Sequence, residues 1–193
     1  TTSVPDSTVA GAITFGNAVW NAGKASVVVS TNTSYTIEYQ VNSTAGAWTK
    51  VNTGVAGGTS ITVSNLNHND IVYARLTDGT SSGNHANVTI ADTTAPTVTL
   101  TLSGTTNSMV ATVDAVDNES GISAVATYKF SIKKTSENDS SYVVKQNTAD
   151  KTCTITGLEQ NTSYTVKVEV EDIAGNTGVK TATTTTSILI TSI

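Results

Sequence analysis

The clearest pattern in the chain is a strict alternation of apolar and polar positions near its C-terminal end. Tyr164, Val166, Val168 and Val170 fall on one side, and Thr165, Lys167, Glu169 and Glu171 fall on the other. A period of two predicts a strand with one buried face. The buried face needs a second layer, and a chain without helical periodicity can supply only another sheet. The sequence therefore predicts an all-β protein built as a β-sandwich.

The same alternation recurs along the chain, with polar turns between the apolar runs. In the first half, seven short strands are predicted at 9–15, 24–32, 34–42, from 48 onward, and at 59–66, 70–79 and 85–92. In the second half, strands are predicted at 97–102, 109–116, 126–134, 142–146, 151–156, 164–171 and 178–186. Seven short strands are typical of an immunoglobulin-like sandwich of about 100 residues. We therefore predict two tandem sandwiches.

A proline-containing linker, Ala91 to Pro96, separates the two halves. It sets the predicted domains at 1–91 and 92–193. Proline fixes its own φ angle and restricts the preceding residue, so a stiff, extended joint is expected. The opening nine residues have a similar Thr-Thr and proline arrangement, which suggests an array of repeats. In the same view, the apolar segment Ser187 to Ile193 is expected to pair along a sheet edge or to enter a further domain.

The segment TITGLEQNTSYTVKVEVEDIAGNTG resembles the end of a bacterial fibronectin type III domain, and the resemblance extends from Pro96 to Thr186. It implies that the Tyr164 hydroxyl bonds back to upstream backbone, with Leu158 beneath the ring. The first half has Val72 at the corresponding spacing, with Tyr73 displaced by one, so it is a divergent relative. The DTTAPTV joint looks like those between repeats in Gram-positive surface proteins and phage appendages.

Composition narrows the classes of partner. The chain has 193 residues, a formal net charge of −5 and a single cysteine. Proteins that bind nucleic acids or anionic membranes present clusters of Lys and Arg, and this sequence has no such cluster. It also has no apolar run long enough to cross a bilayer. Cys153 alternates with Ile155 on the inward side, so a buried and unreactive thiol is expected.

Catalysis is not predicted. His68 lies in the loop before a predicted strand and His85 in the loop after it, so the two histidines belong to opposite ends of one sandwich. Neither has a nucleophile and an orienting acid in an arrangement that general-base chemistry needs. The chain is expected to be non-enzymatic and to need no cofactor.

Acidic and amide side chains gather in loops that the predicted topology brings to one pole of the second sandwich. They are Asp92, Asp117, Asn118, Glu119, Asp172 and Asn176. Oxygen-only ligands in such loops suit Ca²⁺. The same residue types also cap turns without any metal. Both explanations remain open from the sequence, and turn capping is the preferred one.

Aromatic residues offer a second candidate site. Trp20, Trp48 and Tyr73 in the first half would form a platform for a sugar if they were exposed together. Tryptophan more often fills a core or covers an edge, so a structural role is the alternative.

The function favoured by the sequence is a spacer or presenting repeat of an extracellular protein, on a bacterial surface or in a phage appendage. Its partners would be neighbouring repeats of the same assembly. The alternatives are an adhesin for a host protein, a carbohydrate-binding module, and a filament subunit that donates its C-terminal strand to a neighbouring copy.

Overall fold

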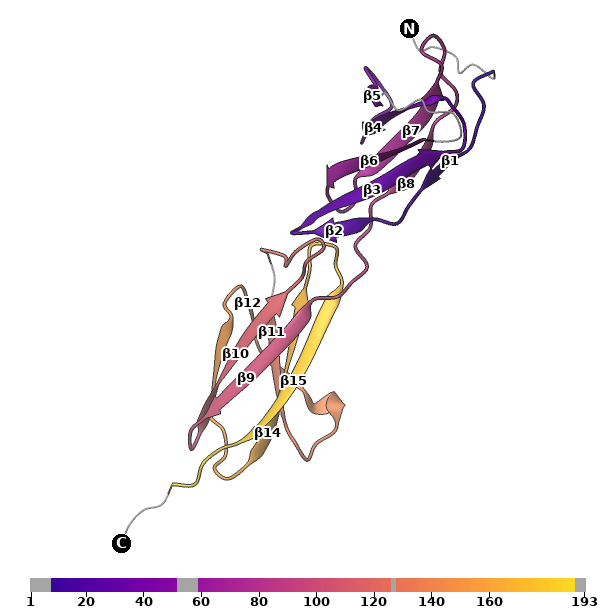
Figure 1. Ribbon diagram of the computed structural model, residues 1–193. Coiled ribbons are helices and arrows are strands. Elements are labelled where there is room, and N and C mark those ends of the chain that lie inside the picture. The colour runs from indigo at the N-terminus through magenta and orange to yellow at the C-terminus, as the bar shows by residue number, and fades with distance from the viewer. Residues whose placement is uncertain (1–7, 52–58, 126–127, 190–193) are drawn as a thin grey trace. The chain divides into compact units, whose positions relative to one another are not determined.

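The chain is built almost entirely of β-strands. The computed structural model describes residues 8–51, 59–125 and 128–189, and within them the only helical element is the 3-10 turn η1 (Asp139–Ser141). Two compact units, Thr1–Asp92 and Thr93–Ile193, divide the chain one residue after the boundary placed from the sequence. Each unit packs two sheets face to face, so the prediction of immunoglobulin-like sandwiches is confirmed (Figure 1). The proline arrangement noted in the opening residues, at Pro5, lies outside the described residues.

The N-terminal unit has two four-stranded sheets. In the first, β3 is central and pairs with β1 and β2 along one edge and with β6 along the other. In the second, the order is β5-β4-β7-β8. The strands are β1 (Ile13–Phe15), β2 (Val19–Asn21), β3 (Lys24–Thr31), β4 (Thr36–Val41), β5 (Thr49–Val51), β6 (Thr59–Leu66), β7 (Ile71–Thr77) and β8 (Ala86–Thr89).

The prediction of seven strands in this unit is wrong by one, because β2 was not foreseen. Phe15 pairs with Val29, and Val19 pairs with Ser26. Three residues therefore separate Phe15 from Val19 on the edge strand, whereas only two separate Ser26 from Val29 on β3. One extra residue on one strand is a β-bulge. β1 and β2 thus form a single edge strand alongside β3 that the bulge interrupts at Gly16. The N–H of Gly16 still donates to the carbonyl of Val28 at 2.8 Å.

The core of the N-terminal unit comes from the inward positions of both sheets. Val29 and Ile37 are fully buried, as are Val72 and Ala74 of β7. The alternation along β7 thus turns Val72 and Ala74 inward and Tyr73 outward. Burial of a branched aliphatic side chain contributes about 1.5–3 kcal/mol, so this alternation fixes which face of β7 meets the core.

The C-terminal unit contains all seven strands that the sequence predicts there. One sheet has the order β13-β10-β9 and the other β12-β11-β14-β15. The strands are β9 (Thr97–Gly104), β10 (Ser108–Val116), β11 (Tyr128–Lys134), β12 (Val143–Thr148), β13 (Thr152–Thr156), β14 (Ser163–Glu171) and β15 (Thr177–Thr185). β14, the strand with the clearest alternation, lies between β11 and β15 as a central strand.

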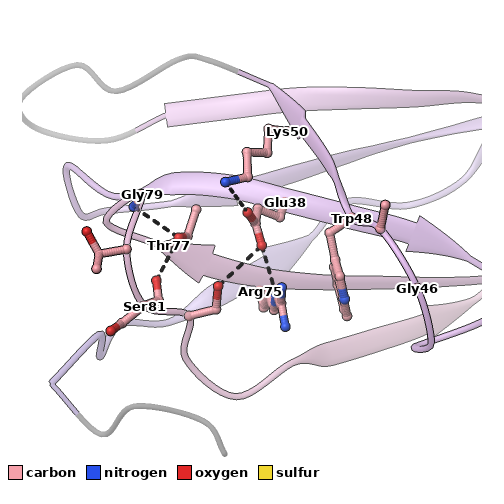
Figure 2. Close-up of a pocket in the computed structure, with 11 residues that line it drawn as sticks. Glu38, Gly46, Trp48, Lys50, Arg75, Thr77, Gly79 and Ser81 are labelled. Atoms are coloured by element: carbon pink, nitrogen blue, oxygen red, sulfur yellow. Dashed lines mark hydrogen bonds and ion pairs between the residues drawn. The ribbon is translucent and has the colours of Figure 1, made fainter. Parts of the chain in front are cut away.

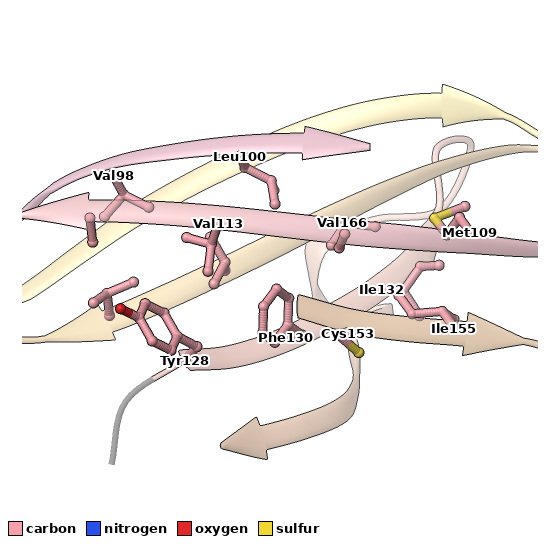
Figure 3. Packing of buried hydrophobic residues seen from close by; sticks show 14 of the residues in the cluster. Val98, Leu100, Met109, Val113, Tyr128, Phe130, Ile132, Cys153, Ile155 and Val166 are labelled. Carbon is pink, nitrogen blue, oxygen red and sulfur yellow. The ribbon is translucent and has the colours of Figure 1, made fainter. Parts of the chain in front are cut away.

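Phe130 is the largest fully buried side chain of this unit, and it packs among aliphatic residues from both sheets (Figure 3). Cys153 points into the same cluster, 2% exposed, as its alternation with Ile155 predicts. Burial raises the pKa of the Cys153 thiol above its ordinary value, although the charge of Lys145 acts in the opposite direction. A thiol in this position stays protonated and unreactive at neutral pH.

The turn before β14 is held by a tyrosine. The backbone N–H of Glu159 donates to the Tyr164 hydroxyl at 3.0 Å, and Leu158 is partly buried against the core. This is the contact that the resemblance to fibronectin type III domains implies.

β9 and β15 run side by side in the same direction in the C-terminal unit (Figure 1). Gly178 at the start of β15 lies against the carbonyl oxygen of Pro96, and Gly104 at the end of β9 faces the backbone of Thr185. A Cβ at position 178 would collide with the Pro96 carbonyl. The N-terminal unit has a similar close approach, because a Cβ at Gly83 would collide with the carbonyl oxygen of Val9.

The described part of the C-terminal apolar segment is not paired as a strand. The N–H of Ser187 donates to the carbonyl of Thr105 at 2.9 Å, and the N–H of Leu189 donates to the Gln160 side chain at 3.1 Å. Ile188 and Leu189 are exposed, and residues 190–193 lie outside the described residues.

Candidate functional site

A polar hollow of about 640 Å³ lies on the outer face of the β5-β4-β7-β8 sheet in the N-terminal unit (Figure 2). Alternation on β4 and β7 brings Glu38 and Arg75 to this face, since the residues between them, such as Ile37 and Ala74, face the core. The β4–β5 turn contributes Trp48 and the β7–β8 loop contributes hydroxyls. The lining side chains used below are Glu38, Trp48, Lys50, Arg75, Thr80, Ser81 and Ser82.

Glu38 is a buried carboxylate at the base of the hollow, with a side chain only 2% exposed. Arg75 on β7 approaches one carboxylate oxygen, Nε to Oε2, at 2.9 Å, and Lys50 on β5 approaches the other at 3.3 Å. The Ser82 hydroxyl donates to Oε2 at 3.4 Å. A buried charge is costly unless it is paired and hydrogen-bonded, and Glu38 has both kinds of partner from three different elements.

Trp48 lies over the guanidinium of Arg75, with 4.2 Å between Arg75 Cζ and the ring centroid. The turn that carries Trp48 is fixed by Gln40, whose Nε2 donates to the Ala47 carbonyl at 2.6 Å, and by Gly46, which has a φ of +87°. A cation stacked on an indole contributes about 0.5–2 kcal/mol, depending on desolvation. Arg75 is therefore held from two sides, by a carboxylate and by an aromatic ring.

Two of the three aromatic residues singled out from the sequence share this face. The His85 ring lies 6.2 Å from Trp48 and 5.5 Å from Tyr73, centroid to centroid, and so links the two. Trp20 does not join them, because β2 belongs to the other sheet of the unit, where Trp20 packs against the core. The predicted three-residue platform is thus reduced to Trp48 and Tyr73, joined by His85.

The β7–β8 loop forms one wall of the hollow and is internally braced. The Thr77 hydroxyl donates to the Ser81 carbonyl at 2.6 Å and accepts from the N–H of Gly79 at 3.0 Å. Asp78 accepts from the N–H groups of Thr80 and Ser81, both at 2.8 Å. These side-chain to backbone bonds hold the wall in place. They position Thr80 and Ser81, and no hydrogen bond among the described residues uses the hydroxyls of these two residues.

A second candidate lies at one end of the C-terminal unit, where the β10–β11 and β14–β15 loops meet. Carboxylate oxygens of Asp117 and Asp172 lie within 4.8 Å of one another. The loops are joined through their backbones, as the Ile173 N–H donates to the Gly121 carbonyl at 2.9 Å. The topology argument from the sequence is correct in bringing these two aspartates together.

Each of these aspartates already has donors from its own loop. Asp172 accepts from the N–H of Asn176 at 2.7 Å and from its side-chain amide at 2.8 Å. Asp117 accepts from the N–H groups of Glu119 and Gly121. The bonds from the backbone N–H groups of Asn176, Glu119 and Gly121 are those by which Asp caps turns. The arrangement therefore supports the preferred explanation.

The remaining residues of the predicted metal set have protein partners of their own. The Thr94 hydroxyl donates to Glu119 at 3.0 Å, and the Asn176 amide approaches the Thr94 carbonyl at 3.4 Å. Asp92 closes the N-terminal unit, where it is buried and its N–H donates to Nδ1 of His68 at 3.0 Å. His68 is thus a structural residue, and His85 is occupied with aromatic neighbours.

No protein-family model matches the chain, and no curated protein is significantly similar to it. Among solved structures, the two-domain fibronectin type III segment of chicken tenascin matches 90% of this chain and 97% of its own, at 9% identity and a TM-score of 0.57. The fold is that of tandem fibronectin type III domains. The FN1–FN3 domains of chicken CNTN1 cover 91% of this chain and 66% of their own at 12% identity and a TM-score of 0.41. A myokine structure covers 50% of this chain and all of its own at 23% identity and a TM-score of 0.40.

The identities are too low to transfer anything beyond this fold. In the part of the chain that the structure covers, no helix is long and apolar enough to cross a membrane.

Proposed function

We propose that the chain is a non-enzymatic repeat segment of an extracellular protein, which spaces or presents other domains of the same polypeptide. The observation that carries this proposal is that each unit has its own pair of sheets and its own hydrophobic core. A domain with a complete core folds without help from its neighbour. Such units can therefore be joined in series, which is what a spacer requires.

The outer faces of the strands support the same role. In the C-terminal unit, hydroxyls bond to one another across the sheet, with 3.0 Å between Thr135 and Thr165 and 3.2 Å between Thr165 and Thr183. Cross-strand hydroxyl pairs of this kind stabilise a sheet and keep its face polar.

The DTTAPTV joint and the 154–178 segment, which look like those of bacterial repeats, favour a Gram-positive surface protein or a phage appendage as the parent. An antibody raised against the folded chain should label intact, unpermeabilised cells or purified virions. Labelling that appears only after lysis would overturn the extracellular assignment.

The spacer role has its own test in the polypeptide that carries the segment. Replacing residues 1–193 by an unrelated tandem fibronectin type III pair should preserve the activity of the domain that is presented, whereas deleting them should reduce it. If the unrelated pair fails although it is folded and displayed, the surface of this segment matters, and the spacer proposal is wrong.

A further inference from the structure

We infer that the hollow on the outer face of the β5-β4-β7-β8 sheet binds a carboxylated sugar, with Arg75 as its anchor. The site belongs to the N-terminal unit alone, so it stands or falls separately from the spacer proposal. Its volume of about 640 Å³ lies within the range of roughly 300–1,000 Å³ that small-molecule sites occupy.

The first step concerns the free edge of the Arg75 guanidinium. Its Nε is used by Glu38 at 2.9 Å, and the ring of Trp48 covers one face. Within the described residues, no protein group accepts from the two terminal Nη groups, and the side chain remains 22% exposed. Two parallel N–H donors on a planar fork match the two oxygens of a carboxylate. The edge that remains is thus shaped for an anion of that geometry.

The second step concerns charge. Lys50 and Arg75 are the cations of the lining and Glu38 is its anion, so the hollow has an excess of one positive charge. This excess stands out in a chain whose formal net charge is −5. Glu38 is too buried to receive a ligand, and it acts as an internal counter-ion that orients Arg75. A ligand with one negative charge would neutralise the excess, which gives the site a preference for anions.

The third step separates a sugar acid from other carboxylates. Trp48 lines the hollow beside Arg75 and offers an aromatic surface for the apolar side of a pyranose ring. On the opposite wall, the hydroxyls of Thr80 and Ser81 make no hydrogen bond within the described chain, although their backbone groups are fixed by Asp78. Hydroxyls that are positioned but unused suit a ligand that has many hydroxyls of its own.

A purely structural stack of Arg75 on Trp48 would also shield this sheet. That role accounts for the cation–π contact and for the Glu38 pair. It does not need Nη groups and lining hydroxyls that have no hydrogen-bond partner within the described residues. The two explanations differ in whether the full chain binds a ligand and in whether Lys can replace Arg75.

The test is a titration of the full chain with glucuronic acid, galacturonic acid and N-acetylneuraminic acid, followed by the fluorescence of Trp48 in a Trp20→Phe background. Glucose and galactose serve as neutral counterparts, and an acidic dipeptide as the carboxylate without a sugar. At least one sugar acid should bind saturably, and its neutral counterpart should bind about tenfold more weakly or less, as expected for the loss of one charge-assisted contact.

Arg75→Lys should weaken the binding of the sugar acid about tenfold or more, because Lys keeps the charge but lacks the fork. Lys24→Gln, which removes a cation from the other sheet of the unit, should leave the affinity unchanged. Thermal unfolding of each variant reports whether the unit is folded.

Three results would overturn the inference: no saturable binding by any sugar acid up to tens of millimolar, equal binding by folded Arg75→Lys, or binding of the acidic dipeptide in preference to every sugar acid. The last result would show that the hollow receives protein carboxylates.

Discussion

The hydroxyl of Tyr164 accepts a hydrogen bond from the backbone N–H of Glu159 at 3.0 Å and so closes the turn that precedes β14. The tyrosine ring is almost fully buried, while the bond itself joins residues only five apart. A buried ring with a bonded hydroxyl fixes where the central strand of the sheet begins.

Tyr164→Phe keeps the ring and removes the hydroxyl, which leaves the Glu159 N–H without its partner. We expect the free energy of unfolding of the C-terminal unit to fall by about 1 kcal/mol. Tyr128→Phe is a matched control, because Tyr128 is equally buried and its hydroxyl makes no hydrogen bond within the described residues. Calorimetry of both variants gives the measurement, and equal losses would show that the Glu159 contact contributes nothing specific.

Gly178→Ala should destabilise the C-terminal unit, because the new Cβ would lie well inside the van der Waals contact distance of the Pro96 carbonyl oxygen. Forcing a methyl group into a packed site costs about 1–3 kcal/mol. Gly104→Ala is the control in the same unit, since its nearest neighbour would be the Thr185 carbonyl oxygen at an ordinary 3.8 Å. Chemical denaturation of the two variants should rank them in this order, and a harmless Gly178→Ala would mean that the Pro96 segment yields readily.

The Asp70 loop predicts a dependence of stability on pH. Burial alone would raise the pKa of Asp70, but hydrogen bonds from Asn42 and Asn67, together with the charge of Lys24, outweigh burial and leave this pKa below its ordinary value of 3.8. A lowered folded-state pKa gives stability that is present above the unfolded-state pKa and is lost as the pH falls through the folded-state pKa.

We therefore expect the N-terminal unit to lose stability as the pH drops below about 4. Asn42→Ala removes the amide that donates to Asp70 at 2.8 Å, so it should raise the folded-state pKa of Asp70 toward its unfolded-state value and make the loss of stability on acidification smaller. NMR titration of the Asp70 carboxyl gives the pKa directly. A wild-type value at or above the ordinary one would contradict the prediction.

Asp172 distinguishes turn capping from calcium binding. If capping explains the loop, Asp172→Ala should lower the free energy of unfolding of the C-terminal unit by about 1–2 kcal/mol through the lost bonds to Asn176, and the same loss should be found with Ca²⁺ and with excess chelator. The calcium hypothesis instead predicts that saturating Ca²⁺ raises the unfolding midpoint of the wild-type chain by several degrees and leaves that of Asp172→Ala unmoved. Thermal unfolding in both solutions decides, and we expect the first outcome.

The strand pattern could be predicted because local alternation determines it. Tyr164, Val166 and Val168 face the core as their spacing requires. The split between β1 and β2 was missed because a bulge at Gly16 leaves no mark in the alternation of so short a segment. The alternation of apolar and polar positions assigns each residue to a face of its strand, but it does not show which sheet the strand joins. For this reason the sequence places Trp20 with Trp48 and Tyr73.

The hollow was not predicted for a related reason. The alternation of β4 turns Glu38 outward, which suggests an exposed carboxylate. Its burial depends on Lys50 and Arg75 from the two neighbouring strands and on Ser82 from a loop. Strand order and register decide these contacts, and they are set by the whole sheet. A charged residue between two apolar strand neighbours was the one available signal.

The parallel course of β9 and β15 has a mechanical consequence. A pulling force on the chain ends enters the C-terminal unit at the start of β9, near Pro96, and leaves at the end of β15, near Thr185. It therefore drags each outer strand lengthwise along its antiparallel partner, β10 or β14, whose hydrogen bonds lie across the direction of pull. Hydrogen bonds loaded in this way share the tension and break together. This unit should therefore unfold in a single event at high force, instead of losing the hydrogen bonds of a strand pair one after another.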